Sequence, residues 1–347
     1  MARGAWIADR LDGGWIEGEG GLRRVGPALG DIVPSGFDAL IRVLHPFTRD
    51  HPVTRSWADY LRVQAGYEAS GEWGELPEIR DESVTWREVA GAHGADPESG
   101  GVAPDQQAFH LLGFEHYGEQ PDGTEINPDG WRYALPREGS PGAGVLANVA
   151  AVLTAHTATP GRGVAAVWEG CADLVSAQGV AYFGWVEEPK SSLPAWLRWL
   201  RQWWFNRTLG FRVFRRRFGT RAALHAQFLP GVQQPAGSGL LPKHAAAGPR
   251  LELPDRAYVC FEAGIRDFTD EAWRDRAPWI DTQSPFAEDQ TPNVIWPEDR
   301  AWFLISEIDF DSTLIACSRA CADSLLTAPG IEAVEITRDT PLWDMHD

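Results

Sequence analysis

The sequence predicts an α+β fold, a single mixed body that carries one inserted amphipathic, basic, tryptophan-rich helical element. Helical and strand-like segments follow one another without the regular strand–helix alternation that a doubly wound sheet requires. The 347 residues are 44% hydrophobic and 11% aromatic, which is enough to form a sizeable core. Residues 189–251 contain no Asp or Glu, whereas the rest of the chain is strongly acidic. These observations predict an acidic body and a chemically distinct insertion.

Five segments place apolar residues at the spacing of a helix that buries one face. They are 36–45, 54–64, 85–92, 143–156 and 313–327. Thr85, with Glu88 three residues later, forms a capping-box signature at the start of the third segment. Pro329-Gly330 is a stop signal for the last one.

Four short apolar or aromatic runs are bounded by turn residues, which is typical of strands. They are 164–168, 180–186, 256–262 and 301–309. The stretch from Gly118 to Gly144 is rich in Gly, Pro and Asp, so we expect an extended loop there.

The overall charge and the cysteines exclude several classes of protein. A net charge of −18 makes a general nucleic-acid binder unlikely, because phosphate would be repelled. The sequence contains neither an apolar run long enough for a transmembrane helix nor a signal-peptide core, so we expect a cytoplasmic protein. The four cysteines lack zinc-ligand spacing. Cys317 and Cys321 fall on the apolar face of the last expected helix, which predicts buried, reduced thiols.

The charge distribution also suggests a division of the chain. The acid-free window holds 11 of the 31 Lys and Arg residues, which leaves 20 basic and 49 acidic residues elsewhere, a balance of about −29. We therefore expect a body formed by 1–188 plus 251–347. The insertion, 189–250, ends in a flexible, Gly- and Pro-rich tether.

Residues 194–218 have the pattern of two short amphipathic helices. Tryptophans gather on one side of the first, with arginines opposite, and phenylalanines and arginines repeat the arrangement after Gly210. The residues expected to make an interaction are Trp196, Trp199, Trp203, Trp204, Arg198, Arg201, Arg212, Arg215 and Arg216. The segment could pack on the acidic body, bind a protein partner, or lie at the anionic inner face of the membrane. The charge of the body favours the first alternative.

Three carboxylates near the C-terminus form a second group of interest. If 301–310 is a strand, its alternation places Glu307, Asp309 and Asp311 on one face. Oxygen ligands of this kind suit Mg²⁺ or Ca²⁺, which makes the three residues candidate metal ligands. A solvated strand edge, followed by a helix cap at Asp311 or Ser312, explains the same residues without a metal. We favour this second interpretation and expect no cofactor.

The histidines show no metal-binding spacing. His45 and His156 each end an expected helix, where a histidine often just satisfies the last carbonyl groups. The alternative is a catalytic cleft in which they act as acid and base together with Glu169, Glu307 and Asp309.

Several short blocks resemble a family of uncharacterised actinobacterial proteins. The blocks are 30–37 (GDIVPSGF), 44–46 (LHP), 156–160 (HTATP), 290–293 (QTPN) and 296–313, which contains WPEDRAW and EIDFDST. The resemblance covers most of the body but not the basic segment. It implies family membership and no particular activity.

The expected function is therefore non-catalytic binding in the cytoplasm. The contact would be made through 194–218, with an unidentified protein partner or with the inner face of the membrane. The main alternative is a metal-dependent or acid–base hydrolase built on Glu307, Asp309 and Asp311 together with His45 or His156.

Replacement of Trp199 and Trp203 by Ala tests where 194–218 binds. If the segment packs on the acidic body, the double variant should lose several kcal/mol of stability in a thermal melt, because large side chains leave cavities. Neither protein should then co-sediment with anionic vesicles. Salt-sensitive vesicle binding combined with an unchanged melt would show that the segment binds membranes instead.

Overall fold

The computed structural model describes residues 16, 28–70, 77–94, 126–171, 174–175, 237, 239–253, 256–281 and 290–341. The contacts divide the chain into two compact units, one formed by 1–168, 251–276 and 288–347, the other by 169–250 and 277–287. The strand expected at 180–186 and the basic segment 194–218 lie outside the described residues. The domain boundaries predicted from charge therefore stay a prediction.

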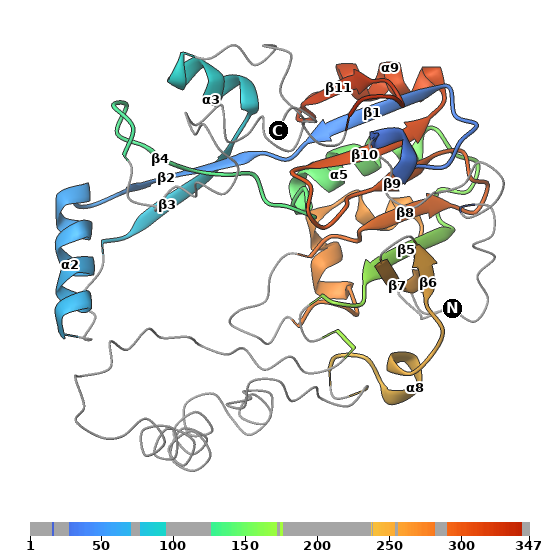
Figure 1. The fold of residues 1–347 in the computed structure, drawn as a ribbon, viewed down its shortest axis with the longest axis horizontal. Coiled ribbons are helices and arrows are strands. Elements are labelled where there is room, and N and C mark those ends of the chain that lie inside the picture. Colours follow the sequence, from blue (N-terminus) through green and yellow to red (C-terminus); the bar gives the residue numbers. More distant parts are fainter. Residues whose placement is uncertain are drawn as a thin grey trace. The chain divides into compact units, whose positions relative to one another are not determined.

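The first unit is built on an eight-stranded antiparallel sheet (Figure 1). In spatial order its strands are β11 (Ala333–Ile336), β1 (Ala39–Leu44), β10 (Ser312–Cys317), β9 (Phe303–Ile305), β8 (Val294–Pro297), β5 (Gly163–Trp168), β7 (Arg256–Glu262) and β6 (Leu251–Leu253). With both helices and antiparallel sheets, the protein has the mixed α+β fold that the sequence predicts.

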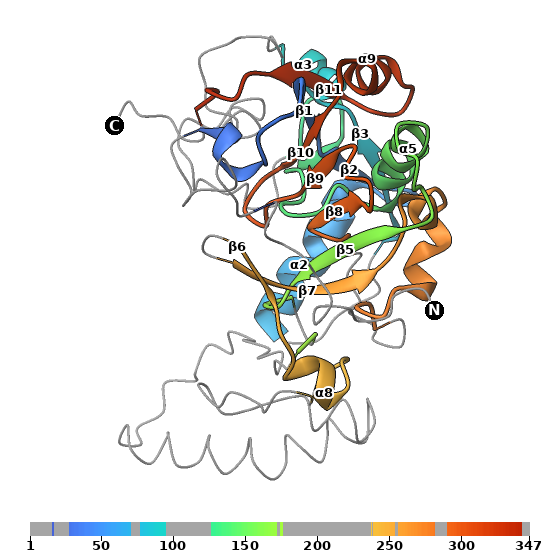
Figure 2. The ribbon, with the colours of Figure 1, turned by 90° about the vertical axis from the view of Figure 1, so that its right-hand side faces the viewer.

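Helical elements cover one face of this sheet (Figure 2). They are α5 (Ala143–Thr154), α9 (Arg319–Thr327) and the 3-10 helices η4 (Ile265–Phe268) and η5 (Glu271–Arg276). In α5 the side chains of Leu146, Val149 and Leu153 are buried, and their spacing places them on a single stripe. Burial of each such side chain contributes about 1.5–3 kcal/mol, which makes packing rather than helix propensity the main support of α5.

The opposite face of the sheet is covered by the 3-10 helix η2 (Leu29–Ile32), whose Leu29 and Ile32 pack in the same apolar cluster as Phe303 and Leu314. The guanidinium of Arg338 holds this cover by donating hydrogen bonds to backbone carbonyls, including that of Gly30 at 2.5 Å. A Cβ on Gly30 would lie 2.5 Å from the carbonyl oxygen of Arg338, so the close approach requires glycine.

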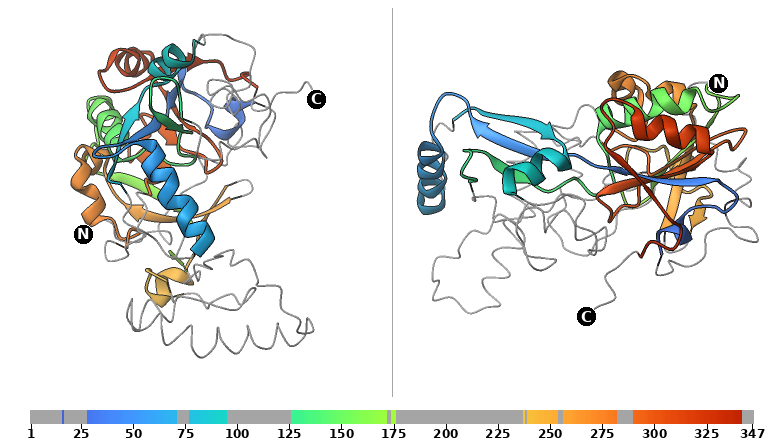
Figure 3. Two further views of the ribbon diagram at one scale, coloured as in Figure 1. Left: turned by 90° about the vertical axis from the view of Figure 1, so that its left-hand side faces the viewer. Right: turned by 90° about the horizontal axis from the view of Figure 1, so that it is seen from above.

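A second sheet of three strands extends from the first (Figures 1 and 3). It comprises β2 (Phe47–Pro52), which follows β1 after two residues, together with β3 (Ile79–Val84) and β4 (Arg132–Ala134). The helix α3 (Trp86–His93) packs Val89 and Ala90 against Phe47 of this sheet. We refer to the three strands with α3 and with α2 (Trp57–Ser70) as the arm.

The helix α2 is held by polar and aromatic contacts. The guanidinium of Arg132 lies 4.7 Å from the ring centroid of Trp57 and 5.3 Å from that of Tyr60, and it pairs with Asp50. The indole of Trp57 also donates a hydrogen bond to the carbonyl of Gly130 at 2.8 Å. None of the α2 side chains that the structure describes is fully buried. Cation–π contact therefore replaces the apolar stripe that normally anchors a helix.

Three sequence-based expectations were wrong, and all concern buried strands. The helix expected at 36–45 is β1, and the first part of the helix expected at 313–327 is β10, so Cys317 lies on a strand and only Cys321 on α9. Both strands are almost entirely buried, and a continuous apolar run does not distinguish a central strand from a helix. The strand expected at 301–309 is only β9, because the acidic residues after it form a turn.

The other expected helices and strands within the described residues match elements of the structure. Helices expected at 54–64, 85–92 and 143–156 correspond to α2, α3 and α5, and strands expected at 164–168 and 256–262 correspond to β5 and β7. Thr85 and Glu88 form the predicted capping box. The last helix is capped by Ser318 rather than by Asp311 or Ser312, and it ends at Thr327, just before the stop signal.

Of the second unit, the described residues include the short helix α8 (Lys243–Ala246). The guanidinium of Arg250 donates hydrogen bonds to the carbonyls of Ala246 and Gly248, both at 2.6 Å, and pairs with Glu169 at 3.1 Å. These bonds fold the chain that follows α8 back onto the helix.

Glu332 joins the large sheet to the arm, and its charge should matter for stability. Its carboxylate accepts hydrogen bonds from the first two N–H groups of α3, on Trp86 at 2.6 Å and on Arg87 at 3.1 Å. Glu332→Gln should cost about 1 kcal/mol in urea unfolding, because it removes a negative charge from a helix N-terminus. Glu335→Gln, which breaks an exposed pair with Arg319, is the matched control and should cost clearly less, because solvent screens an exposed pair. Equal losses would contradict this role of Glu332.

Candidate functional site

His45 occupies the junction between the large sheet and the arm. It follows β1 directly, its backbone N–H donates to the carbonyl of Asp311 at 3.0 Å, and its own carbonyl accepts the indole N–H of Trp86 at 2.7 Å. The imidazole is completely buried. Its Nδ1 lies 2.6 Å from the carbonyl oxygen of Arg137 and its Nε2 lies 2.9 Å from Oγ1 of Thr313. Every polar group of His45 is therefore engaged within the protein.

The partners of His45 fix its protonation state. A carbonyl oxygen can only accept, so Nδ1 carries the hydrogen and Nε2 accepts from the hydroxyl of Thr313. Thr313 in turn lies 2.6 Å from the hydroxyl of Ser306, which becomes the donor at the end of this chain. Burial lowers the pKa of His45 to about 3, opposed by the hydrogen bond to Arg137 and reinforced by the charges of Arg42 and Arg137. His45 is a neutral structural group at physiological pH.

More buried polar side chains continue the network beside Ser306. The amide of Asn293 donates to the carbonyl of Ser306 at 3.2 Å, and its oxygen accepts the N–H of Trp168 at 2.9 Å. The hydroxyls of Thr291 and Ser140 lie 3.0 Å apart. These bonds join the loop before α5, the loop before β8 and the end of β9 in one polar layer.

On the other side of β1 and β10 lies a buried ion pair. The guanidinium of Arg42 donates to Oδ1 of Asp311 at 3.0 Å and to the hydroxyl of Ser312 at 2.9 Å, and it lies 5.9 Å from the ring centroid of Trp86. Burial raises the pKa of Asp311, and the charge of Arg42 opposes that rise. Because removal of one partner leaves a buried charge, the pair links the two strands firmly.

Two loops bring further carboxylates to this end of the sheet. We call the group formed by Glu138, Glu307, Asp309 and Asp311 the acidic loop cluster. Arg256 on β7 pairs with Glu307 at 3.3 Å and with Asp309 at 2.7 Å. Glu138 is exposed, but partial loss of hydration and the charges of its three acidic neighbours raise its pKa. Burial also raises the pKa of Glu307.

The cluster does not have the geometry of a metal site. Glu307 and Asp309 lie in a turn, closed by the N–H of Asp309 donating to the carboxylate of Glu307 at 2.8 Å, rather than along one face of a strand. In the described ranges no group of three or more His, Cys, Asp or Glu side chains is arranged to hold a metal ion. The proposed ligand set Glu307, Asp309 and Asp311 is therefore not supported.

The two histidines expected in a catalytic cleft lie in different parts of the first unit. His156 follows the C-terminal end of α5 and contacts Ser324 at 3.0 Å, whereas the Arg137 carbonyl that contacts His45 lies in the loop before the N-terminal end of α5. The 12 residues of α5 span about 18 Å, which separates the two histidines. Glu169 belongs to the second unit, where it pairs with Arg250.

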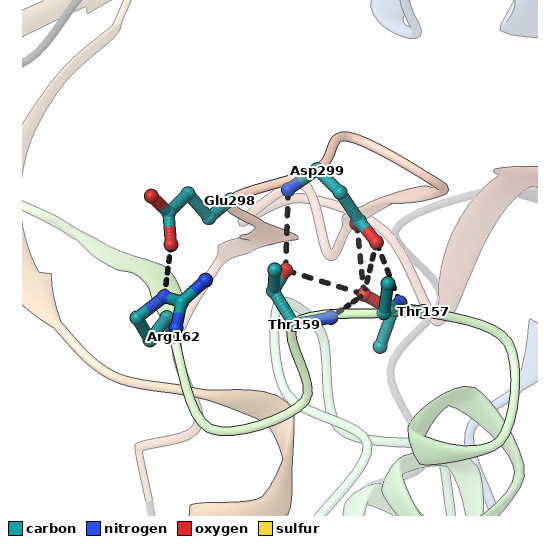
Figure 4. Close-up of polar contacts among 6 residues, drawn as sticks. Thr157, Thr159, Arg162, Glu298 and Asp299 are labelled. Atoms are coloured by element: carbon teal, nitrogen blue, oxygen red, sulfur yellow. Dashed lines mark hydrogen bonds and ion pairs between the residues drawn. The ribbon is translucent and has the colours of Figure 1, made fainter.

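The segments around His156 and the β8–β9 turn form a separate polar corner, shown in Figure 4. The carboxylate of Asp299 accepts hydrogen bonds from the hydroxyl of Thr157 at 2.8 Å and from the N–H of Ala158 at 2.6 Å, and Arg162 pairs with Glu298. Arg300, which follows Asp299, has a positive φ of 56°. These contacts close a tight turn and explain why two distant sequence blocks meet here.

Sequence reasoning missed Arg42, Arg256 and Glu138. Arg42 stands within an apolar strand, where a lone charge indicates a buried pair, and that signal was available. Glu138 lies in the loop 137–140, whose approach to the turn after β9 depends on Gly139, since a Cβ there would lie 2.9 Å from the Cα of Ile308. No local pattern announces such a contact.

Comparison with known proteins adds no assignment: no family model, curated protein or solved structure matches the chain. Among the helices that the structure describes, none has the length and apolar character needed to cross a membrane. Function must therefore be inferred from the side chains.

The neutral state of His45 predicts a specific acid sensitivity. Its pKa is about 3 in the folded protein and about 6.5 when unfolded, so the stability it provides is complete above pH 6.5 and is lost as pH falls toward 3. The loss should reach about 1.4 kcal/mol per pH unit. His45→Asn keeps a donor for the Arg137 carbonyl but cannot titrate. The difference in unfolding free energy between wild type and variant should shrink on acidification, and a constant difference would contradict a buried neutral His45.

Proposed function

We propose that this protein is a non-catalytic binding protein of the cytoplasm. The observation that carries the proposal is the complete internal hydrogen bonding of His45, whose backbone N–H bonds to Asp311 of the acidic loop cluster. A general base needs a free nitrogen within reach of substrate. Both nitrogens of His45 are bonded inside the protein, and its pKa of about 3 lies far from physiological pH.

The carboxylates support the same proposal. A hydrolase whose acid–base chemistry relies on carboxyl groups, such as a glycosidase, needs a pair of them in different protonation states that both face substrate. Arg256 instead bridges Glu307 and Asp309, and Arg42 neutralises Asp311. Such pairs suit a rigid, charged surface better than a proton-transfer site.

The basic segment 194–218 is proposed to make the contact. It has amphipathic, tryptophan-rich character, and its partner would be a protein or the anionic inner face of the membrane.

A hydrolase screen tests the proposal directly. Wild type and a Glu307→Gln/Asp309→Asn variant would be incubated with p-nitrophenyl esters, phosphates and glycosides, with and without Mg²⁺ or Ca²⁺. We expect equal background rates, and no rise in Tm with either cation beyond that in a monovalent salt control. Hydrolysis that requires Glu307 or Asp309, or a saturable Asp309-dependent rise in Tm, would establish the enzyme alternative instead.

A further inference from the structure

Two thiols lie in contact where the central strand β10 passes into α9. Cys317 is the last residue of β10, and Cys321 lies in the first turn of α9. The two side chains are joined by a hydrogen bond between their thiol groups. Both residues are buried, with 0% and 1% of their surface exposed, and neither is in a disulfide. The junction of strand and helix therefore holds a dithiol whose sulfur atoms already meet.

The chain between the two cysteines faces solvent. Ser318, Arg319 and Ala320 are all exposed, so the buried thiols flank an exposed segment. The first turn of α9 is closed by the N–H of Cys321, which donates to Oγ of Ser318 at 3.4 Å, a long hydrogen bond. Helix ends open more readily than well-packed helix interiors. Opening of this single turn would admit an oxidant as small as hydrogen peroxide.

The contact gives the two thiols different roles. Cys317 donates the hydrogen bond, which raises its pKa, and burial raises that pKa further. Cys321 accepts the bond, which lowers its pKa against the opposing effect of burial. The first turn of a helix also favours a negative charge on sulfur. Cys321 is therefore the nucleophilic thiol, and Cys317 is placed to attack it once it has been oxidised.

A disulfide suits these surroundings better than a metal ion. The neighbours along the two elements are apolar and buried, among them Ile315 on β10 and Leu325 on α9. Two thiolates that hold a monovalent soft metal ion keep a net negative charge, which is costly in an apolar core, whereas a disulfide is neutral.

We propose that Cys317 and Cys321 form a redox-sensitive pair that closes to a disulfide when a peroxide oxidises it. The thiolate of Cys321 attacks one oxygen of hydrogen peroxide, the O–O bond breaks, and Cys321 becomes a sulfenic acid while the hydroxide takes up the thiol proton as water. The sulfur of Cys317 then attacks the sulfur of Cys321, the S–O bond breaks, and the hydroxyl leaves as water with the proton of Cys317. Two thiols are oxidised, and one peroxide is reduced to two waters.

The product ties the first turn of α9 to the central strand of the sheet, because the two sulfur atoms approach to about 2.05 Å. The same helix contacts β11 through Arg319 and Glu335, and it contacts His156 through Ser324. Oxidation therefore fixes the position of α9 on the sheet. This redox step does not depend on the proposed binding function.

Thiol counting after peroxide treatment tests the pair. Native protein is exposed to hydrogen peroxide, treated with catalase, denatured, and analysed by thiol titration and peptide mass spectrometry. Wild type should fall from four titratable thiols to two, linked between positions 317 and 321, and dithiothreitol should restore all four. Cys260→Ser, the matched control at another fully buried thiol, should lose the same two thiols. Cys317→Ser should form no disulfide at position 321 and should instead give a dimedone adduct on Cys321.

Three results would overturn the proposal. One is four titratable thiols in wild type after a peroxide exposure that fully oxidises free cysteine. The second is a disulfide that includes Cys171 or Cys260, and the third is oxidation of Cys321 to a sulfinic acid while Cys317 stays reduced. All three are read from wild type, so the test stands even where a variant folds poorly.

Discussion

The hydrogen bonds of a single buried residue, His45, connect the parts of the first unit. Its backbone carbonyl accepts the indole N–H of Trp86 from the arm, and its imidazole donates to the carbonyl of Arg137 in the loop before α5 and accepts from the hydroxyl of Thr313 on β10. These elements are far apart in sequence, and an apolar replacement of the imidazole would leave the Arg137 carbonyl and the Thr313 hydroxyl without this partner. Burial of a neutral ring costs much less than burial of a charge, so the low pKa is a condition for this architecture.

The ion pair between Arg42 and Asp311 is a second buried polar contact that connects β1 to β10. It lies on the opposite side of the same two strands and shares Trp86 as a neighbour. The two groups therefore divide the end of the sheet into a neutral hydrogen-bonded side and a charged side. The charged side reaches solvent through Asp309 and Glu138.

Some elements of this structure were predictable because their sequences show a helix cap or a stripe of apolar residues along one face. The helix α3 shows its cap in Thr85 and Glu88, and α5 shows a regular apolar stripe. The central strands β1 and β10 are buried on both faces, so their sequences carry no alternation of exposed polar and buried apolar residues that reveals a strand. Of the candidate site, Glu307 and Asp309 were identified, but their turn geometry and their pairing with Arg256 depend on side-chain bonds formed only after folding. His45 was expected at a helix end and instead terminates a strand.

The most direct test of this account is the protonation state of His45, measured by ¹⁵N NMR of the imidazole across pH. The neutral form with hydrogen on Nδ1 should persist from pH 8 down to about pH 4, because the pKa of His45 is about 3 and Nδ1 donates to the Arg137 carbonyl. An imidazolium signal for His45 near pH 6, or hydrogen on Nε2 alone, would contradict the buried neutral imidazole and its hydrogen bond to Arg137. Either result would reopen the possibility of a catalytic histidine.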